Sequence, residues 1–299
     1  MCVVRALVPR AASAHAVLRT AGLALCLGGM LAATATAALP VWQTLPVPDA
    51  SQLAPTATGH VDVDGARLSY ASYGTGSPVL LLHGGLGSGD DWALQVPALT
   101  AAGHRVITLD SRGHGRSTRG PGAMHYQRMA DDVIALLDHL DIERTALIGW
   151  SDGGIIGLDL AIRHPERLTR LVAFAANARA DGIALDGGAN AVGDAYAEKA
   201  AADYRRRSPT PDDYAGFLAA MEAMWGSEPD YSDRQLATIR TPTLIAAGEH
   251  DEYIRADHTR AIAAAIPGAR LAILPGMSHF GLWQAPDDFN RVVLDFLAD

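Results

Sequence analysis

Three polar residues, widely separated in the sequence, have the types that nucleophilic catalysis by a serine needs. Ser151 lies in GWSDGG (149–154), Asp251 ends the stretch LIAAGEHD, and His279 lies in PGMSHF. A serine hydroxyl is a weak nucleophile until a base takes its proton, and a third group must orient that base. The order serine, acid, histidine along the chain is compatible with acyl transfer through such a triad.

The serine stands between Gly149 and Gly153, after the apolar run RTALIGW and before the helix-like run GGIIGLDLAI. A G-x-S-x-G nucleophile elbow is a sharp turn from a strand into a helix, and side chains at its flanks would keep the two elements apart. The start of the helix would also direct backbone N–H groups at nearby negative charge. With thirty glycines in the chain, the G-x-S-x-G pattern could occur by chance. Whether it is a nucleophile elbow therefore depends on whether Ser151 has an acid and a base as partners.

The acid and the base follow from their positions. Asp251 stands at the end of an apolar run, and its short side chain suits a fixed carboxylate beneath an imidazole. Glu249 and Glu252 flank it as alternatives, and a purely structural Asp251 is another. Among eleven histidines, His279 alone follows the final apolar run in a loop that contains glycine. We therefore predict a triad of Ser151, His279 and Asp251.

Acyl transfer also needs hydrogen-bond donors for the oxyanion of its tetrahedral intermediate. HGGL (83–86) follows the apolar run VLLL, and in elbow enzymes a glycine-rich loop at such a place supplies one donor. We predict the backbone N–H groups of Gly85 and Asp152 as the oxyanion hole, with Leu86 as the alternative to Gly85. A simpler interpretation is that HGG only makes a tight turn.

These residues need a rigid support, and the sequence alternates continuous apolar runs with helix-like stretches. Such runs suit central strands of a parallel sheet covered by helices on both faces, so we predict a doubly wound α/β sheet. HVDVDGARLSYASYG alternates around Asp64-Gly65 and predicts an antiparallel hairpin near His60. The other predicted strands are PVLLLHG, RVITLD, RTALIGW, RLTRLVAFAA, TPTLIAAGEHD and ARLAILPG, and the helices between them include YQRMADDVIALLDHL, DHTRAIAAAIP and DDFNRVVLDFLA.

One segment breaks this alternation. Residues 178–235 hold the helix-like stretches DAYAEKAAADYRRR and DDYAGFLAAMEAMW but no strand-like run. We predict a helical cap over the carboxyl edge of the sheet, where open α/β sheets bind ligands, rather than a solvated excursion without function. The core is then formed by residues 59–177 and 236–299, and the Pro-rich stretch 39–58 is a linker.

Residues 1–38 have the order of a secretory signal peptide: arginines, the apolar run AGLALCLGGMLAA and the small-residue sequence TATAA. We expect cleavage after Ala37 or Ala38 and export, to a periplasm or out of the cell. The apolar run is shorter than the roughly 20 residues of a membrane span, so an uncleaved anchor is the lesser alternative. Both cysteines, Cys2 and Cys26, lie in this leader, so the mature chain would carry neither thiol nor disulfide.

The composition of the 299-residue chain is that of a globular protein, with 49% apolar and 19% charged residues and a net charge of −9. A nucleic-acid partner is not expected, because phosphate binding needs clustered Lys and Arg, and the tight basic run Arg205–Arg207 suits a solvated helix face. No zinc-type His/Cys spacing occurs, and HGGLGSG lacks the Lys-Ser/Thr ending of a nucleotide loop. The sequence therefore predicts no metal and no cofactor.

Together the motifs resemble the α/β-hydrolase family from about His60 to the last residue. LLLHGGLGSGDDW, LDSRGHGRST, LIGWSDGG, AGEHDEY and PGMSHF look like its successive landmarks, and GWSDGG looks most like the valacyclovirase or biphenyl-hydrolase-like group. The resemblance implies an α/β-hydrolase fold with an inserted cap and hydrolysis of small esters, aminoacyl esters among them. It also implies that the Asp152 carboxylate lies near a substrate ammonium, whereas a solvated or helix-capping carboxylate is the alternative. Asp110 and Arg112 look like scaffold residues.

We therefore expect a serine hydrolase that acts on a small-molecule ester, with Asp152, Leu86, Trp150 and Trp225 at the substrate. The same triad also serves lactone opening, cleavage of a carbon–carbon bond beside a ketone, and iminopeptidase chemistry. A non-catalytic exported binding protein is the alternative of another class, although it would have no reason to keep all the catalytic parts. Further aromatic residues that would line the pocket, or else pack in the core, are Trp92, Tyr253, Phe280 and Trp283.

Overall fold

The computed structural model describes residues 38–184 and 190–298. The predicted signal peptide, residues 1–38, lies outside the described residues except for Ala38, so export stays a prediction. The compact unit described below begins at Leu39. Within the described part of the chain, no helix is both long and apolar enough to cross a membrane.

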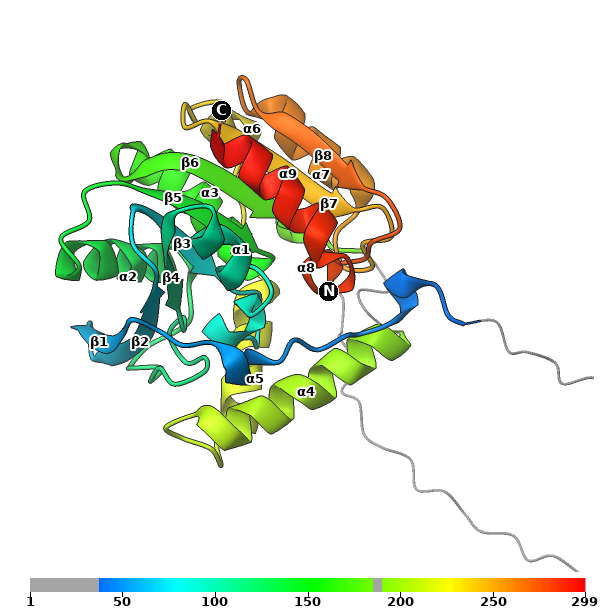
Figure 1. Cartoon of the computed structure of the whole chain (residues 1–299). Coiled ribbons are helices and arrows are strands. Elements are labelled where there is room, and N and C mark those ends of the chain that lie inside the picture. The colour runs from blue at the N-terminus through cyan, green and yellow to red at the C-terminus, as the bar shows by residue number, and fades with distance from the viewer. Residues whose placement is uncertain (1–37, 185–189, 299) are drawn as a thin grey trace, which may run out of the picture. The chain divides into compact units, whose positions relative to one another are not determined.

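Among the described residues, eight strands form one sheet in the order β1-β2-β4-β3-β5-β6-β7-β8 (Figure 1). The β1–β2 and β2–β4 pairs are antiparallel, and the other neighbouring strands pair parallel. The mostly parallel, doubly wound sheet predicted from the apolar runs is thus confirmed. The strands are β1 (Ala57–Val63), β2 (Ala66–Tyr73), β3 (Ser77–Leu82), β4 (His104–Leu109), β5 (Thr145–Trp150), β6 (Leu168–Phe174), β7 (Thr243–Gly248) and β8 (Arg270–Leu274).

The first two strands form the predicted hairpin, with Asp64-Gly65 as its turn. Both turn residues have positive φ, 45° and 73°, which is the conformation of a tight two-residue hairpin turn. Val61 and Leu68 pair across the hairpin and are buried on its core side. The alternation of apolar and polar residues therefore predicted both the turn and the buried face.

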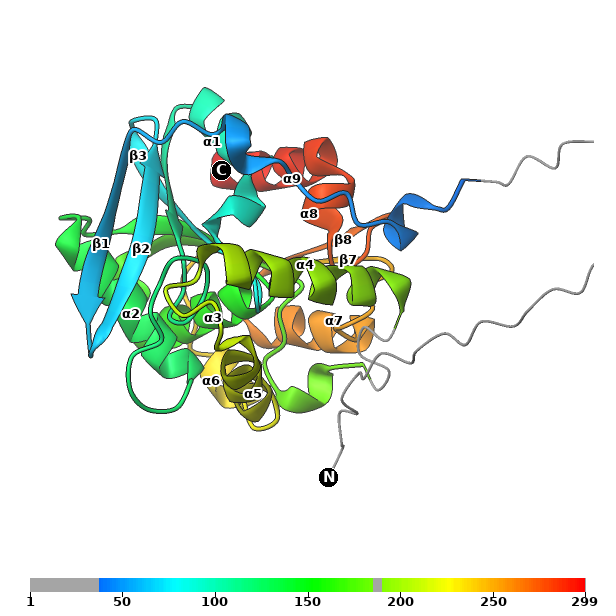
Figure 2. The same cartoon turned by 90° about the horizontal axis from the view of Figure 1, so that it is seen from below.

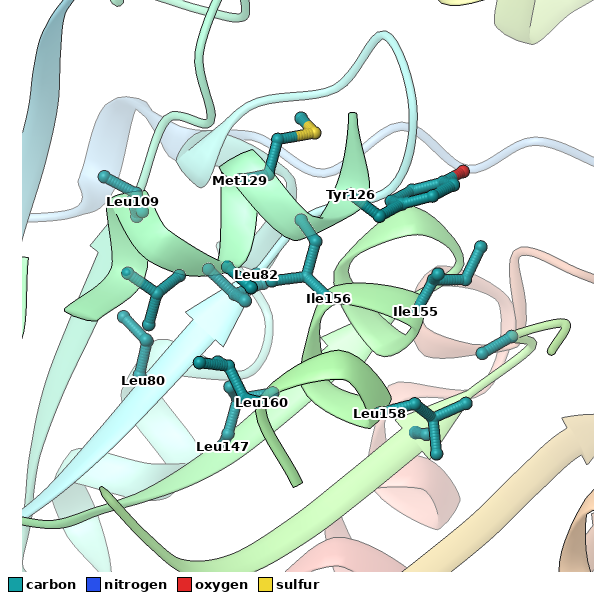
Figure 3. Packing of buried hydrophobic residues seen from close by; sticks show 14 of the residues in the cluster. Leu80, Leu82, Leu109, Tyr126, Met129, Leu147, Ile155, Ile156, Leu158 and Leu160 are labelled. Atoms are coloured by element: carbon teal, nitrogen blue, oxygen red, sulfur yellow. The ribbon is translucent and has the colours of Figure 1, made fainter. Parts of the chain in front are cut away.

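Helices cover both faces of the sheet, and two clusters of buried side chains join the layers. Leu80 and Leu82 of β3 belong to the cluster that includes side chains of α2 and α3 (Figure 3). Val79 and Leu81 belong to the cluster with α1 and α9, because neighbouring residues of a strand point to opposite faces. The helices of the core are α1 (Val96–Ala101), α2 (Tyr126–His139), α3 (Asp152–Arg163), α7 (Ala256–Ala265), α8 (Gly281–Gln284) and α9 (Pro286–Ala298).

The segment between β6 and β7 is helical, as predicted for residues 178–235, and we call it the cap. Its described part carries α4 (Ala191–Arg207), α5 (Tyr214–Trp225) and the short α6 (Asp233–Leu236), and adds no strand to the sheet. Figure 2 shows α4 as a long helix outside the sheet. Lys199 of α4 reaches Asp91 with a distance of 2.7 Å between Nζ and Oδ1, so a charge pair attaches the cap to the core.

The basic run at the end of α4 is solvated at Arg205 and Arg206, as predicted, but not at Arg207. The Arg207 guanidinium contacts Asp90 and the Ser88 hydroxyl, and its side chain is 16% exposed. Arg206 is 64% exposed and pairs with Asp203 on its own helix. Successive residues of a helix point in different directions, so one of three consecutive arginines turns toward the loop that α4 covers.

The stretch 39–58, predicted as a linker, makes contacts of its own. It contains two single 3₁₀ turns, η1 (Val41–Gln43) and η2 (Ala50–Gln52). Trp42 stacks on His250 with 4.5 Å between ring centroids, and the Gln284 amide donates to the Thr44 carbonyl oxygen at 2.9 Å. The stretch therefore contacts the loop after β7 and helix α8.

A buried ion pair holds the loop after β4. Arg112 donates from Nε to Asp132 Oδ2 at 2.8 Å, and its Nη2 contacts the other oxygen of the same carboxylate. The two side chains are 0% and 3% exposed. Asp110 accepts from the Gly89 N–H at 2.7 Å. Asp110 and Arg112, which look like scaffold residues in the sequence, thus bond to other groups of the protein and hold loops in place.

Replacing Asp132 with alanine would leave the Arg112 guanidinium buried without its anion. We expect the free energy of unfolding to fall by about 3–5 kcal/mol, because an uncompensated buried charge is costly. The matched control is Asp138→Ala, which removes an exposed partner of Arg167 and should cost less than about 1 kcal/mol. Urea unfolding measures both, and equal losses in the two variants would contradict the prediction.

Candidate active site

Ser151 occupies the turn between β5 and α3, with the strained backbone angles φ 53° and ψ −118°. A methyl group added at Gly149 would overlap the backbone of Gly153, and one added at Gly153 would overlap the Leu82 carbonyl. Glycine is therefore needed at both flanks for strand and helix to approach this closely. A non-glycine residue at positive φ in such a packed turn is typical of a functional site.

The loop after β7 presents three carboxylates, and the structure separates their contacts. Asp251 Oδ1 accepts from His279 Nδ1 at 2.9 Å, and also from the N–H groups of Tyr253 and Ile254. Glu252 Oε2 accepts from the backbone N–H of His279 at 3.0 Å. Glu249 Oε2 accepts instead from the Gly276 N–H. Asp251 is thus the carboxylate that contacts the imidazole.

The His279 loop is tied to the elbow. Trp150, which directly precedes the serine, donates from its indole N–H to the His279 carbonyl oxygen at 2.9 Å. Since Nδ1 faces Asp251, Nε2 is the remaining nitrogen of the imidazole, and among the described residues it has no hydrogen-bond partner. Tyr253 packs against the same imidazole, with 4.7 Å between ring centroids. The sheet thereby brings the three predicted triad residues to one edge.

The electrostatics of His279 favour its protonated form. Burial lowers the pKa of the imidazole. The negative charges of Asp251, Glu252 and Asp152 together raise it by more than burial lowers it, so the pKa lies above its usual value. Burial also raises the pKa of the Glu252 carboxyl. A base whose charged form is stabilised takes up a proton more readily, which is what activation of a hydroxyl requires.

The predicted oxyanion loop lies against the serine. A methyl group added at Gly84 would be 3.2 Å from the Ser151 Cβ. Leu86 has a positive φ of 64°. In the described ranges no acceptor is paired with the backbone N–H of Gly85, Leu86 or Asp152. Such open N–H groups beside a serine can stabilise a developing oxyanion.

The Asp152 side chain is neither solvated nor a helix cap. It is buried, with the Tyr126 hydroxyl donating to Oδ1 at 2.7 Å and the Trp225 indole donating to Oδ2 at 3.1 Å. Burial raises the pKa of this carboxyl, although the two hydrogen bonds lower it in part. Among the residues described, no Lys or Arg pairs with it. The carboxylate is thus held in place by neutral donors.

The aromatic residues expected at the substrate fall into two groups. Trp225 and Tyr253 are partly exposed, and so is the aliphatic Leu86. Trp150 is 1% exposed, and it packs against protein side chains while bonding the His279 carbonyl. The expected pocket residues that instead fill the core are Trp92, Phe280 and Trp283, because their rings pack between the sheet and α8–α9.

Comparison with known proteins agrees with this geometry. Residues 77–203 match the model of the alpha/beta hydrolase fold. A provisionally named carbamate hydrolase of Azorhizobium caulinodans is 32% identical, over 78% of this chain and 96% of the relative. The serine hydrolase BPHL of Mus musculus is 30% identical, over 86% of this chain and 94% of the relative. The chain belongs to the α/β-hydrolase family. The resemblance to the biphenyl-hydrolase-like group is thereby confirmed.

Solved structures show the same relationship. The enol-lactonase from Burkholderia xenovorans LB400 superposes on this α/β hydrolase with a TM-score of 0.65 and 26% identity. The match covers 81% of this chain and all of the lactonase chain. In the parts described, no group of three or more His, Cys, Asp or Glu side chains is arranged to hold a metal ion.

Two contacts of this α/β hydrolase's site could not be predicted from the sequence, although Glu252 was one of the flanking alternatives to Asp251. Tyr126 opens α2 and reaches Asp152 at the start of the neighbouring helix α3, and Glu252 reaches the backbone of His279 across two loops. Both contacts depend on how separate elements pack, so no local pattern marks them.

Removing the charge of Glu252 should lower the pKa of His279. In Glu252→Gln the amide oxygen can still accept the His279 N–H, but one of the negative charges that favour the imidazolium is gone. The neutral base should then persist to lower pH. NMR titration of the histidine ring measures this directly. Glu249→Gln, which alters an exposed carboxylate, is the control, and an unchanged His279 in the Glu252 variant would refute the prediction.

Proposed function

We propose that this α/β hydrolase cleaves small carboxylic esters through an acyl-enzyme on Ser151. His279 is the base and Asp251 orients it. The observation that carries the proposal is the 2.9 Å contact between His279 Nδ1 and Asp251 Oδ1, in a loop bonded to the residue before the strained serine. An imidazole held through Nδ1 keeps Nε2 available as an acceptor, which supports the assignment of His279 as the base.

In the proposed reaction, His279 Nε2 takes the hydroxyl proton while the Ser151 oxygen attacks the ester carbonyl carbon. The backbone N–H of Asp152, with that of Gly85 or Leu86, stabilises the oxyanion. Collapse of the intermediate breaks the bond to the leaving alcohol, which receives the proton from the imidazolium. Water then attacks the acyl-enzyme with the same base and releases the carboxylic acid.

Ser151→Ala should lose the nucleophile and little else. We expect kcat/KM for nitrophenyl esters to fall by roughly a thousandfold or more, and covalent labelling by a fluorophosphonate to vanish. Ser51→Ala, at an exposed serine far from the elbow in sequence, is the control and should keep both activities. If the wild-type protein neither turns over any ester nor takes the label, the hydrolase proposal fails and the binding-protein alternative gains.

The alternatives on the same triad are lactone opening, carbon–carbon bond cleavage and iminopeptidase activity. Similarity to an enol-lactonase supports adding lactones to the substrate panel. Ketone substrates with a cleavable carbon–carbon bond and Pro-peptides complete it. The class with the highest kcat/KM identifies the reaction, and a lactone that outpaces every ester replaces the ester proposal.

We propose further that Asp152 binds the ammonium group of an aminoacyl ester. Its carboxylate is buried next to Ser151 and accepts hydrogen bonds only from the neutral donors Tyr126 and Trp225 among the described residues. A carboxylate offers about four acceptor positions, so capacity remains for a cation. Attraction across a site from which water is excluded is stronger than in bulk water.

The test compares two substrates that differ only in the ammonium group, a valine ester and the ester of 3-methylbutanoic acid. Asp152→Asn should lower kcat/KM for the valine ester by roughly tenfold while the other ester changes little. Tyr126→Phe keeps the charge and should retain the preference. Equal losses on both esters in Asp152→Asn would show that the carboxylate supports the fold of the site and does not select the substrate.

A further inference from the structure

Helix α4 of the cap places one hydroxyl on the oxyanion loop. Tyr196 donates from its phenol to the Gly85 carbonyl oxygen at 2.7 Å. The side chain is buried, and its residue is 8% exposed. Burial raises the pKa of this phenol well above its usual value, which favours the protonated hydroxyl and so its role as a donor.

The peptide that Tyr196 holds is one of the two that matter for an oxyanion. The carbonyl of Gly85 and the N–H of Leu86 belong to the same planar trans peptide and point in opposite directions. A Gly85 carbonyl that is held toward the cap therefore keeps the Leu86 N–H pointing away from the cap. The preceding peptide is fixed independently, because the Gly84 carbonyl oxygen accepts from His83 Nδ1 at 2.7 Å and from the Gly87 N–H.

The loop needs such restraint. Consecutive glycines reorient their peptides easily, and Leu86 holds a positive φ that a leucine rarely adopts. No side chain at Gly84 or Gly85 can anchor the backbone by packing. Hydrogen bonds to the carbonyl oxygens are therefore what keeps the N–H groups directed, and the one at Gly85 comes from the cap.

We infer that Tyr196 is a positioning residue that pre-orients the oxyanion hole from the cap, an inference that rests on the proposed ester hydrolysis. Donors that are already directed at the oxyanion cost nothing to reorient during the reaction, and they act chiefly on the transition state. Without the hydroxyl, the Gly85–Leu86 peptide samples other orientations, and the rate falls while the substrate still binds.

A second contact joins α4 to the same loop. Lys199 Nζ lies 2.7 Å from Asp91 Oδ1, and Asp91 Oδ2 accepts from the backbone N–H of Ser88 at 2.9 Å. These side chains are 12% and 3% exposed. The Tyr196 ring also packs against Phe280, with 4.9 Å between centroids. One face of α4 therefore holds the oxyanion loop at Gly85 and, through Asp91, at Ser88.

Tyr196→Phe tests the inference, because it removes the hydroxyl and keeps the buried ring. Ester turnover is measured per serine that a fluorophosphonate labels at completion, so unfolded protein does not count. We expect kcat to fall roughly tenfold with KM within twofold of wild type. The tetrahedral adduct of n-butylboronic acid places an oxygen in the oxyanion hole, so the inhibition constant of this compound should rise by a similar factor. The pH at which kcat/KM reaches half its maximum should stay unchanged.

Tyr204→Phe is the matched control, since Tyr204 is a second buried tyrosine of α4 whose hydroxyl contacts Thr210 and not the oxyanion loop. It should keep kcat and boronic acid affinity. The inference is overturned if Tyr196→Phe matches wild type in both kcat and boronic acid affinity. It is also overturned if Tyr196→Phe raises KM alone, or if Tyr204→Phe lowers kcat as much. A wild-type protein that neither turns over esters nor takes the label overturns the proposed function instead, so the two failures are distinct.

Discussion

The site depends on one close approach of backbone to backbone. Helix α3 begins against the ends of β3 and β5, where Gly149 and Gly153 leave no room for a side chain. This contact forces Ser151 into its positive-φ turn and aims the first N–H groups of α3 at the sheet edge. The strain is sustained by the packing around it, since every residue of β5 and the residues of α3 from Asp152 to Ala161 are buried.

From that turn outward, the site is assembled by contacts between loops. The histidine loop is bonded to Trp150 through its own carbonyl, and Asp251 holds the imidazole while backbone N–H groups hold Asp251. Each group that would move a proton is thus positioned by another fixed group. Such preorganisation is worth more than additional contacts, because chemistry in a buried site is penalised by any reorientation of dipoles.

The sequence was informative where chemistry demands one residue type at a fixed place in an element. The elbow glycines could be predicted because strand and helix approach too closely for side chains. Asp251 and His279 could be proposed because each follows a strand end, from which the reach of a side chain is short. The flanking glutamates were not separable in sequence, since only the orientation of the loop decides which carboxylate meets the imidazole. Aromatic residues were the weakest predictions. The sequence does not distinguish Trp92 and Trp283, which are buried in the core, from Trp225, which is partly exposed. Only the packing of the folded chain separates them.

The 3₁₀ turn at Val41–Gln43 has a mechanical consequence. Trp42 stacks on His250, directly beside the acid, and Gln284 bonds both Thr44 and the hydroxyl of Ser278, directly beside the histidine. A few residues at the front of the fold therefore brace the two loops whose spacing sets the acid–base contact. Loss of these residues would remove the contacts with both loops and leave every strand pairing of the sheet in place.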